Sequence, residues 1–308
     1  MKYISRLEHE GLQWVNVTRQ TKKELDELAE RFNFLPIDLA ESAPSFQRPK
    51  IVRRPGYYFI VLHFPVFDRE TKRLSFTEID FFLNANYLVT VHDGTLHPLE
   101  SFFAACAKEE TKKELHFTGT AVHILFELLD TLLQAVFPIL LHVNEDISAV
   151  DKKLFSRAAE RHIAEEILRL KTNIVTFRRA MQGHKTVLER LVMYGDRDLN
   201  LYSYQSYINT LREAATEIWH MLDSQKESIN ALHETNESIL SLRMNEVMKT
   251  LTVISVITFP LTLVATIFAI RAPATPLVNV PYGFFFISFL TLLGAALMLL
   301  AFKKKHWL

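Results

Sequence analysis

The sequence predicts an α+β protein in which an N-terminal α/β module and long helices precede a stalk helix that continues into a two-helix transmembrane hairpin. Three observations predict this fold class. Aromatic and β-branched residues gather in short segments of the first hundred positions, glycine and proline number only 8 and 11 among 308 residues, and two long uncharged segments lie near the C-terminus. Few turn-forming residues favour long helices, and long uncharged segments favour membrane spans.

Composition narrows the class of function. Lysine plus arginine equals aspartate plus glutamate at 35 each, so the chain lacks the basic excess typical of nucleic-acid-binding proteins. A single cysteine, Cys106, cannot form an intrachain disulfide, which predicts that most of the chain lies in the cytosol. We expect Cys106 to be a small buried residue on a helix. The first residues lack a continuous apolar segment, so no cleaved signal peptide is expected.

Residues 1–120 are predicted to form the α/β module. Strand-like segments occur at Trp14–Val17, Tyr57–Phe67 and Ile79–His92, and turn signals (RRPG, DRETKR and HDG) bound the second and third. The sequence KKELDELAERF, Lys22–Phe32, has the apolar spacing of an amphipathic helix.

Residues 121–200 are predicted to be a helical hairpin region. Apolar residues recur there at helical spacing, and Gly183 is the only glycine inside the segment before Gly195. Gly195 and Asp196 predict a turn at which the chain enters the stalk, so that the helices before and after it form a long antiparallel pair.

Residues 201–250 are predicted to be the stalk helix. Its apolar positions recur in steps of three, four or seven along one seam: Leu201, Tyr204, Ile208, Leu211, Ala215, Ile218, Leu222, Ile229, Leu232 and Ile239. A helix continuing to Ile270 would extend roughly 105 Å. Such a seam needs cover from other helices of the same chain or from further copies of it.

Two transmembrane helices are predicted at residues 251–270 and 282–302, joined by an outer loop at 271–281 and followed by a basic tail at 303–308. Neither span holds an aspartate, glutamate, lysine, arginine or histidine, and each has about the 20 residues that cross a bilayer core. A buried helical pair in a soluble core is the alternative, which two such spans disfavour. Lysine and arginine flank the hairpin on the stalk and tail sides, whereas the loop has only Arg271. Both termini are therefore expected in the cytoplasm, with the chain a multi-pass protein of the cell inner membrane.

Three segments resemble the CorA family of magnesium channels: MNEVMKTLTVISVITFPLTLVATIF (residues 244–268), the tail FKKKHWL and the strand-like NYLVTVH. The resemblance covers nearly the whole chain and is tight only over residues 244–271 and 302–308. It implies a CorA-like homopentamer, not an enzyme, in which the first span of each subunit lines a central pore. It also implies Mg²⁺ or another divalent cation as substrate and possible regulator, with no covalently bound cofactor.

The chain departs from the family at the pore mouth. The family's signature Gly-Met-Asn closes the first span, whereas an ungapped alignment from Met248 places Ala269, Ile270 and Arg271 there. A ring of arginines is typical of anion pores and would repel a divalent cation. Alternatively, each arginine extends outward to lipid headgroups and forms no ring.

Other candidate pore residues keep a helical spacing of three, four or seven. By resemblance they face the axis, with Met248 and Leu251 as a hydrophobic gate; simple helix packing is the alternative. The set is Asn245, Met248, Leu251, Thr252, Phe259, Thr262 and Thr266. Glu234 matches an acidic position of the family and is a candidate ligand of a regulatory magnesium site, although a solvated stalk glutamate is the simpler interpretation.

The leading functional prediction is a CorA-like channel or transporter that passes Mg²⁺ or another divalent cation. Two alternatives remain open at this stage. Arg271 could give a pore of altered selectivity, for anions or for cation efflux. The chain could also form a non-conducting pentameric membrane scaffold or sensor.

Overall fold

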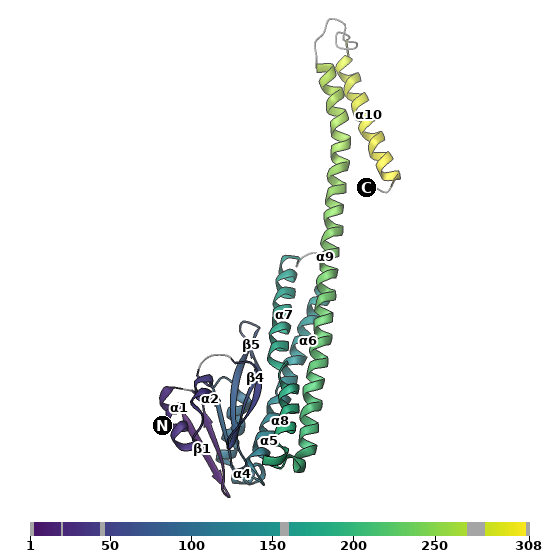
Figure 1. Cartoon of the computed structure of the whole chain (residues 1–308). Coiled ribbons are helices and arrows are strands. Elements are labelled where there is room, and N and C mark those ends of the chain that lie inside the picture. The colour runs from purple at the N-terminus through teal and green to yellow at the C-terminus, as the bar shows by residue number, and fades with distance from the viewer. Residues whose placement is uncertain (1–2, 20, 44–46, 155–159, 270–280, 306–308) are drawn as a thin grey trace. The chain divides into compact units, whose positions relative to one another are not determined.

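The computed structural model describes residues 3–19, 21–43, 47–154, 160–269 and 281–305. The chain divides into two compact units, Met1–His233 and Glu234–Leu308, which are described separately. The first holds a mixed sheet with its helices, and the second holds the end of one very long helix with a shorter helix after it (Figure 1).

The six-stranded sheet has the order β1-β2-β6-β5-β4-β3. Its strands are β1 (Ile4–His9), β2 (Leu12–Val17), β3 (Lys50–Arg54), β4 (Tyr57–Asp68), β5 (Arg73–Leu83) and β6 (Tyr87–His92). All neighbours are antiparallel except β2 and β6, which run parallel. This parallel pair joins segments about seventy residues apart in sequence, with Trp14 opposite Leu88.

Alternating side chains give the sheet two apolar faces, because successive strand residues point to opposite sides. Val15, Phe59 and Val89 lie on one face, in a cluster with Leu28 of α1 (Lys22–Phe32) and Leu39 of α2 (Pro36–Glu41). Trp14, Ile60, Phe64, Phe81 and Leu88 lie on the other face, in a larger cluster with the later helices. The sheet is therefore covered on both sides, which explains the nearly continuous apolar run of β4.

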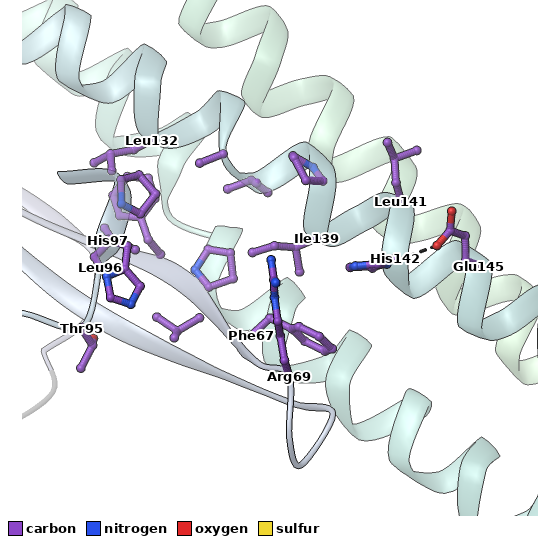
Figure 2. A pocket seen from close by; sticks show the side chains of 17 residues that line it. Phe67, Arg69, Thr95, Leu96, His97, Leu132, Ile139, Leu141, His142 and Glu145 are labelled. Atoms are coloured by element: carbon purple, nitrogen blue, oxygen red, sulfur yellow. Dashed lines mark hydrogen bonds and ion pairs between the residues drawn. The ribbon is translucent and has the colours of Figure 1, made fainter. Parts of the chain in front are cut away.

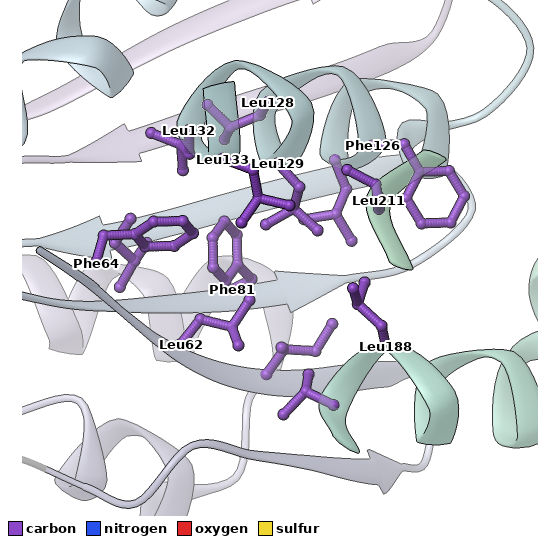
Figure 3. Close-up of a cluster of buried hydrophobic side chains, with 14 of the residues drawn as sticks. Leu62, Phe64, Phe81, Phe126, Leu128, Leu129, Leu132, Leu133, Leu188 and Leu211 are labelled. Atoms are coloured by element: carbon purple, nitrogen blue, oxygen red, sulfur yellow. The ribbon is translucent and has the colours of Figure 1, made fainter. Parts of the chain in front are cut away.

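The larger cluster is formed by α3 (His97–Lys108), α5 (Ala121–Gln134), α6 (Val136–Lys153), α7 (Glu160–Met181), α8 (His184–Leu199) and the first part of α9 (Gln205–Ala269). Figure 3 shows Leu128, Leu129, Leu132 and Leu133 of α5 above Phe64 and Phe81 of the sheet. The short helix α4 (Glu110–His116) links α3 to α5. Cys106 is buried on α3, as predicted, and burial raises the pKa of its thiol to about 11.

Two predicted boundaries were wrong. The predicted strand Ile79–His92 is two strands, because Asn84 Oδ1 accepts the backbone N–H of Asn86 at 2.8 Å and turns the chain between β5 and β6. The predicted turn at Gly195 and Asp196 lies inside α8, which ends at Leu199 with Asn200 in the left-handed conformation. A Cβ at position 195 would come within 2.8 Å of Leu201 Cδ1, so this glycine serves close packing and not a turn.

The seam predicted along the stalk is confirmed for its first half. Ile208, Leu211, Ile218, Leu222 and Ile229 are all buried. Within the same unit, Gln225 of α9 donates from Nε2 to the backbone oxygen of Leu140 on α6 at 2.8 Å. Helices of the same chain therefore cover this part of α9. The helix begins at Gln205, after the 3₁₀ turn η2 (Leu201–Tyr204).

His184, the first residue of α8, should make the first unit acid-sensitive. Its ring is buried edge-on against Phe64 at a centroid distance of 4.9 Å, and burial lowers its pKa to about 4. An unfolded histidine titrates near 6.5, so between pH 6.5 and 4 the unfolded state binds more protons and stability falls with acid. We expect this group to remove about 2 kcal/mol of unfolding free energy between pH 7 and pH 5.

Urea unfolding of the detergent-solubilised chain at both pH values would measure this effect. In the variant His184→Phe, the unfolding free energy should fall less between pH 7 and pH 5 than in the wild type, because phenylalanine keeps an aromatic ring and cannot accept a proton. The variant His162→Gln changes an exposed histidine, so it should keep the wild-type difference. Equal pH dependence in His184→Phe and the wild type would contradict the prediction.

Candidate functional site

The candidate pore residues lie on one exposed face of α9 in the second unit. Met248, Leu251 and Phe259 have exposed fractions of 55, 56 and 73%, which is unusual for large apolar side chains. The four polar members of the set are exposed as well: Asn245, Thr252, Thr262 and Thr266. All seven candidate pore residues are therefore accessible to other copies of the chain or to other molecules.

The opposite face of the same helix is less exposed. Val253 is 3% exposed, and the partly buried positions Ile257, Leu261, Val264 and Phe268 continue from it in steps of three and four. On α10 (Gly283–Lys304), a Cβ added at Gly294 would lie 3.8 Å from Leu261 Cδ2. This stripe therefore faces α10, which leaves the candidate pore residues on the side turned away from it. The residue-based prediction did not identify the stripe, although its spacing is visible in the sequence.

The threonine hydroxyls on the exposed face donate to their own helix. Thr252 Oγ1 donates to the backbone oxygen of Met248 at 2.8 Å, and Thr262 Oγ1 to that of Thr258 at 2.8 Å. Thr266 Oγ1 donates in the same way to the oxygen of Leu263 at 2.9 Å. Because each hydroxyl has one proton, its outward lone pairs remain as acceptors. A row of acceptors suits the water shell of a cation, whose hydrogen atoms point outward.

The single proline of the first span, Pro260, lies inside α9 without ending it. Proline lacks the N–H that would bond the carbonyl four residues earlier, at Val256. The hydroxyl of the nearby Thr262 does not bond this carbonyl, because it donates to the backbone oxygen of Thr258.

The mouth residues are only partly within the described structure. Ala269 is the last residue of α9 and is exposed. Ile270 and Arg271 lie outside the described residues, so the direction of the Arg271 side chain stays a prediction.

Glu234 is exposed on α9. Across the described residues, no group of three or more histidine, cysteine, aspartate or glutamate side chains is arranged to hold a metal ion. The regulatory role of Glu234 stays a prediction.

Among the residues that the structure describes, three helical segments have the length and composition to cross a membrane: Ala121–Lys153, Leu201–Ala269 and Gly283–Lys304. Half of the apolar window of the first is buried inside the protein, where α5 packs on the sheet, which accounts for its apolar character. The apolar windows of the other two are 6 and 0% buried. These two contain the predicted spans. Exposing such large apolar surfaces to water is unfavourable, so lipid or other copies of the chain must cover them.

Comparison with known proteins also indicates a protein that spans the membrane. Residues 9–304 match the family described as "CorA-like Mg2+ transporter protein". The chain is 24% identical to the putative metal ion transporter YfjQ of Bacillus subtilis, over 99% of this chain and 93% of that protein. It is 25% identical to the cobalt/magnesium transport protein CorA of Thermotoga maritima, over 96% of this chain and 83% of that protein.

Solved structures show the same fold. The complete CorA magnesium transporter from Methanocaldococcus jannaschii matches with a TM-score of 0.82 at 19% identity, covering 98% of this chain and 93% of that one. The full-length CmaX protein matches with a TM-score of 0.74 at 17% identity, covering 96% and 89%. Members of the matched family are ion transporters and not enzymes. The chain belongs to the CorA-like Mg²⁺ transporter family.

Proposed function

We propose that five copies of the chain form a channel in the cell inner membrane that passes Mg²⁺ or another divalent cation, with both termini in the cytoplasm. The observation that carries this proposal is the division of α9 into two faces. One face packs toward α10, and the other exposes Asn245, Met248, Leu251, Phe259 and the three threonines. A ring of such faces around an axis would bury the apolar members and present the polar ones to a water-filled path.

The residues of this face suit passage of a hydrated cation. Met248 and Leu251 lie at the cytoplasmic end of the proposed span, where a ring of apolar side chains would close the path by dewetting. Beyond them, the hydroxyl oxygens of Thr252, Thr262 and Thr266 can accept hydrogen bonds from water bound to the ion. The ion gradient and the membrane potential would supply the driving force. Glu234 would add a regulatory magnesium ligand if a neighbouring copy supplied the others.

One residue favours a second candidate function. Arg271 stands where the family has asparagine, and an arginine ring would favour anions over divalent cations. A non-conducting pentameric scaffold is the remaining alternative. Fluxes of Mg²⁺, Co²⁺, Ni²⁺, Zn²⁺ and chloride into proteoliposomes test all three. Divalent uptake supports the leading proposal, chloride flux alone supports the second, and no flux of any ion supports the scaffold.

The proposed gate yields its own prediction. Replacing Leu251 by serine should raise Mg²⁺ flux several-fold, because a hydroxyl ring holds water where an apolar ring excludes it. The matched control is Val264→Ser, which makes the same kind of change on the face toward α10 and should not raise flux. Dye-reported Mg²⁺ influx into proteoliposomes measures both variants. If Leu251→Ser conducted no faster than the wild type, Leu251 would not be part of the gate.

A further inference from the structure

A cavity of about 490 Å³ opens on the first unit, and none of the candidate pore residues lines it (Figure 2). Its walls come from three places: the end of β4, the connection between β6 and α3, and the junction of α5 with α6. Phe67, Pro98, Leu132, Pro138 and Ile139 make the lining largely apolar. This volume and lining are typical of sites for small molecules.

A single guanidinium reaches across this apolar lining. Arg69 directly follows β4, and Figure 2 shows its side chain extending from the β4–β5 hairpin toward Ile139 of α6. Within the described ranges, no carboxylate lies within ion-pair distance of Arg69. The lining therefore includes an exposed guanidinium that forms no ion pair with the described carboxylates.

The acidic residue of the lining, Glu145, already contacts another lining residue. Glu145 Oε2 lies 3.2 Å from Nδ1 of His142, one turn earlier on α6 (Figure 2). The ring of His142 lies beside Phe67, with centroids 6.2 Å apart. At this end of the cavity the carboxylate would repel a second anionic group, so the cavity favours a ligand with one anionic end.

We propose that this cavity binds a small apolar monocarboxylate. The planar guanidinium of Arg69 matches a carboxylate, with two parallel N–H donors for its two oxygens. The hydrocarbon body would lie against Phe67, Pro138 and Ile139, where it leaves water. A bound ligand would join the β4–β5 hairpin to α6. This inference concerns a site distinct from the proposed pore and does not depend on the ion that is transported.

Calorimetric titration of the full chain in lipid nanodiscs with 3-phenylpropanoate tests the proposal, with empty nanodiscs correcting for partition into lipid. A ligand of this size should bind saturably with a Kd of about 0.1 to 1 mM. The uncharged probe 3-phenylpropanamide has the same shape and should bind at least about tenfold more weakly, because it cannot form the charge-assisted pair.

Three variants locate the site. Arg69→Met keeps the apolar stem and should weaken binding of 3-phenylpropanoate by about tenfold or more. Arg73→Met removes a charge from the same hairpin outside the cavity, so the Kd should not change. Ile139→Trp should fill the space and abolish binding of both probes. The proposal is overturned if the wild type shows no saturable binding, if the amide binds as well as the acid, or if Arg69→Met binds like the wild type.

Discussion

Replacing Arg271 by asparagine should raise Mg²⁺ uptake by between about tenfold and a hundredfold. Each arginine about 6 Å from a divalent ion in a water-like dielectric repels it by about 1.4 kcal/mol, and five together by about 7 kcal/mol. Physiological salt reduces this sum to roughly half. Flexible side chains can also bend away from the axis, which places the expected gain below that limit.

Mg²⁺ influx into proteoliposomes under an inside-negative potential measures the effect. Arg271→Lys keeps the charge and should stay close to the wild type, which separates the effect of charge from that of side-chain shape. Lys303→Gln removes a charge from the last turn of α10 and should leave uptake unchanged. A parallel chloride measurement should fall in Arg271→Asn if the arginine ring attracts anions. Unchanged Mg²⁺ uptake in Arg271→Asn would show that the guanidinium points away from the ion path.

The sequence predicted the helices best where periodicity or charge was unambiguous. The stalk seam, for example, is buried at Ile218, Leu222 and Ile229 because packing follows the helical repeat directly. Gly183 and Gly195 look alike in the sequence but play different parts. A Cβ at Gly183 would come within 2.1 Å of Pro49 Cβ, and this glycine stands at the break between α7 and α8, whereas α8 runs through Gly195. The two glycines can be distinguished only once the folded structure shows which residues pack against each of them.

The order of the strands in the sheet could not be predicted from sequence patterns. The pairing of β2 with β6 depends on contacts between Gln13–Val17 and Tyr87–Val91, and alternation within each strand does not identify its neighbour. The candidate pore residues share a face because their spacing is helical, so that grouping could be predicted. Which face packs on α10 could not, because it depends on Gly294 lying beside Leu261.

A buried ion pair between α2 and β3 was also not predicted from the sequence. The side chain of Asp38 is fully buried, and Arg54 donates to it from Nε at 2.9 Å and from Nη2 at 2.6 Å. Tyr57 donates its hydroxyl proton to the same carboxylate at 2.6 Å and accepts the backbone N–H of Leu35 at 3.0 Å. Burial, and then the bond to Asp38, raise the pKa of Tyr57 to about 12, so the hydroxyl stays a donor at neutral pH.

Removing Arg54 should therefore be among the most destabilising single changes in the first unit. Arg54→Met leaves a fully buried carboxylate with Tyr57 as its remaining side-chain donor, and breaking a buried pair in this way costs about 3 kcal/mol or more of unfolding free energy. Urea unfolding of the detergent-solubilised chain, followed by tryptophan fluorescence, to which the buried Trp14 contributes, measures the loss. Lys112→Met breaks an exposed pair with Glu109 and should cost less than about 1 kcal/mol.

A double variant separates the cost of an unpaired charge from the value of the pair. Arg54→Met together with Asp38→Leu removes both charges, so stability should recover relative to Arg54→Met alone, because no buried charge remains without its partner. Tyr57 keeps its bond from the Leu35 N–H but loses its acceptor, which limits the recovery. If the double variant were no more stable than Arg54→Met, the unpaired buried carboxylate would not be the main cause of the loss.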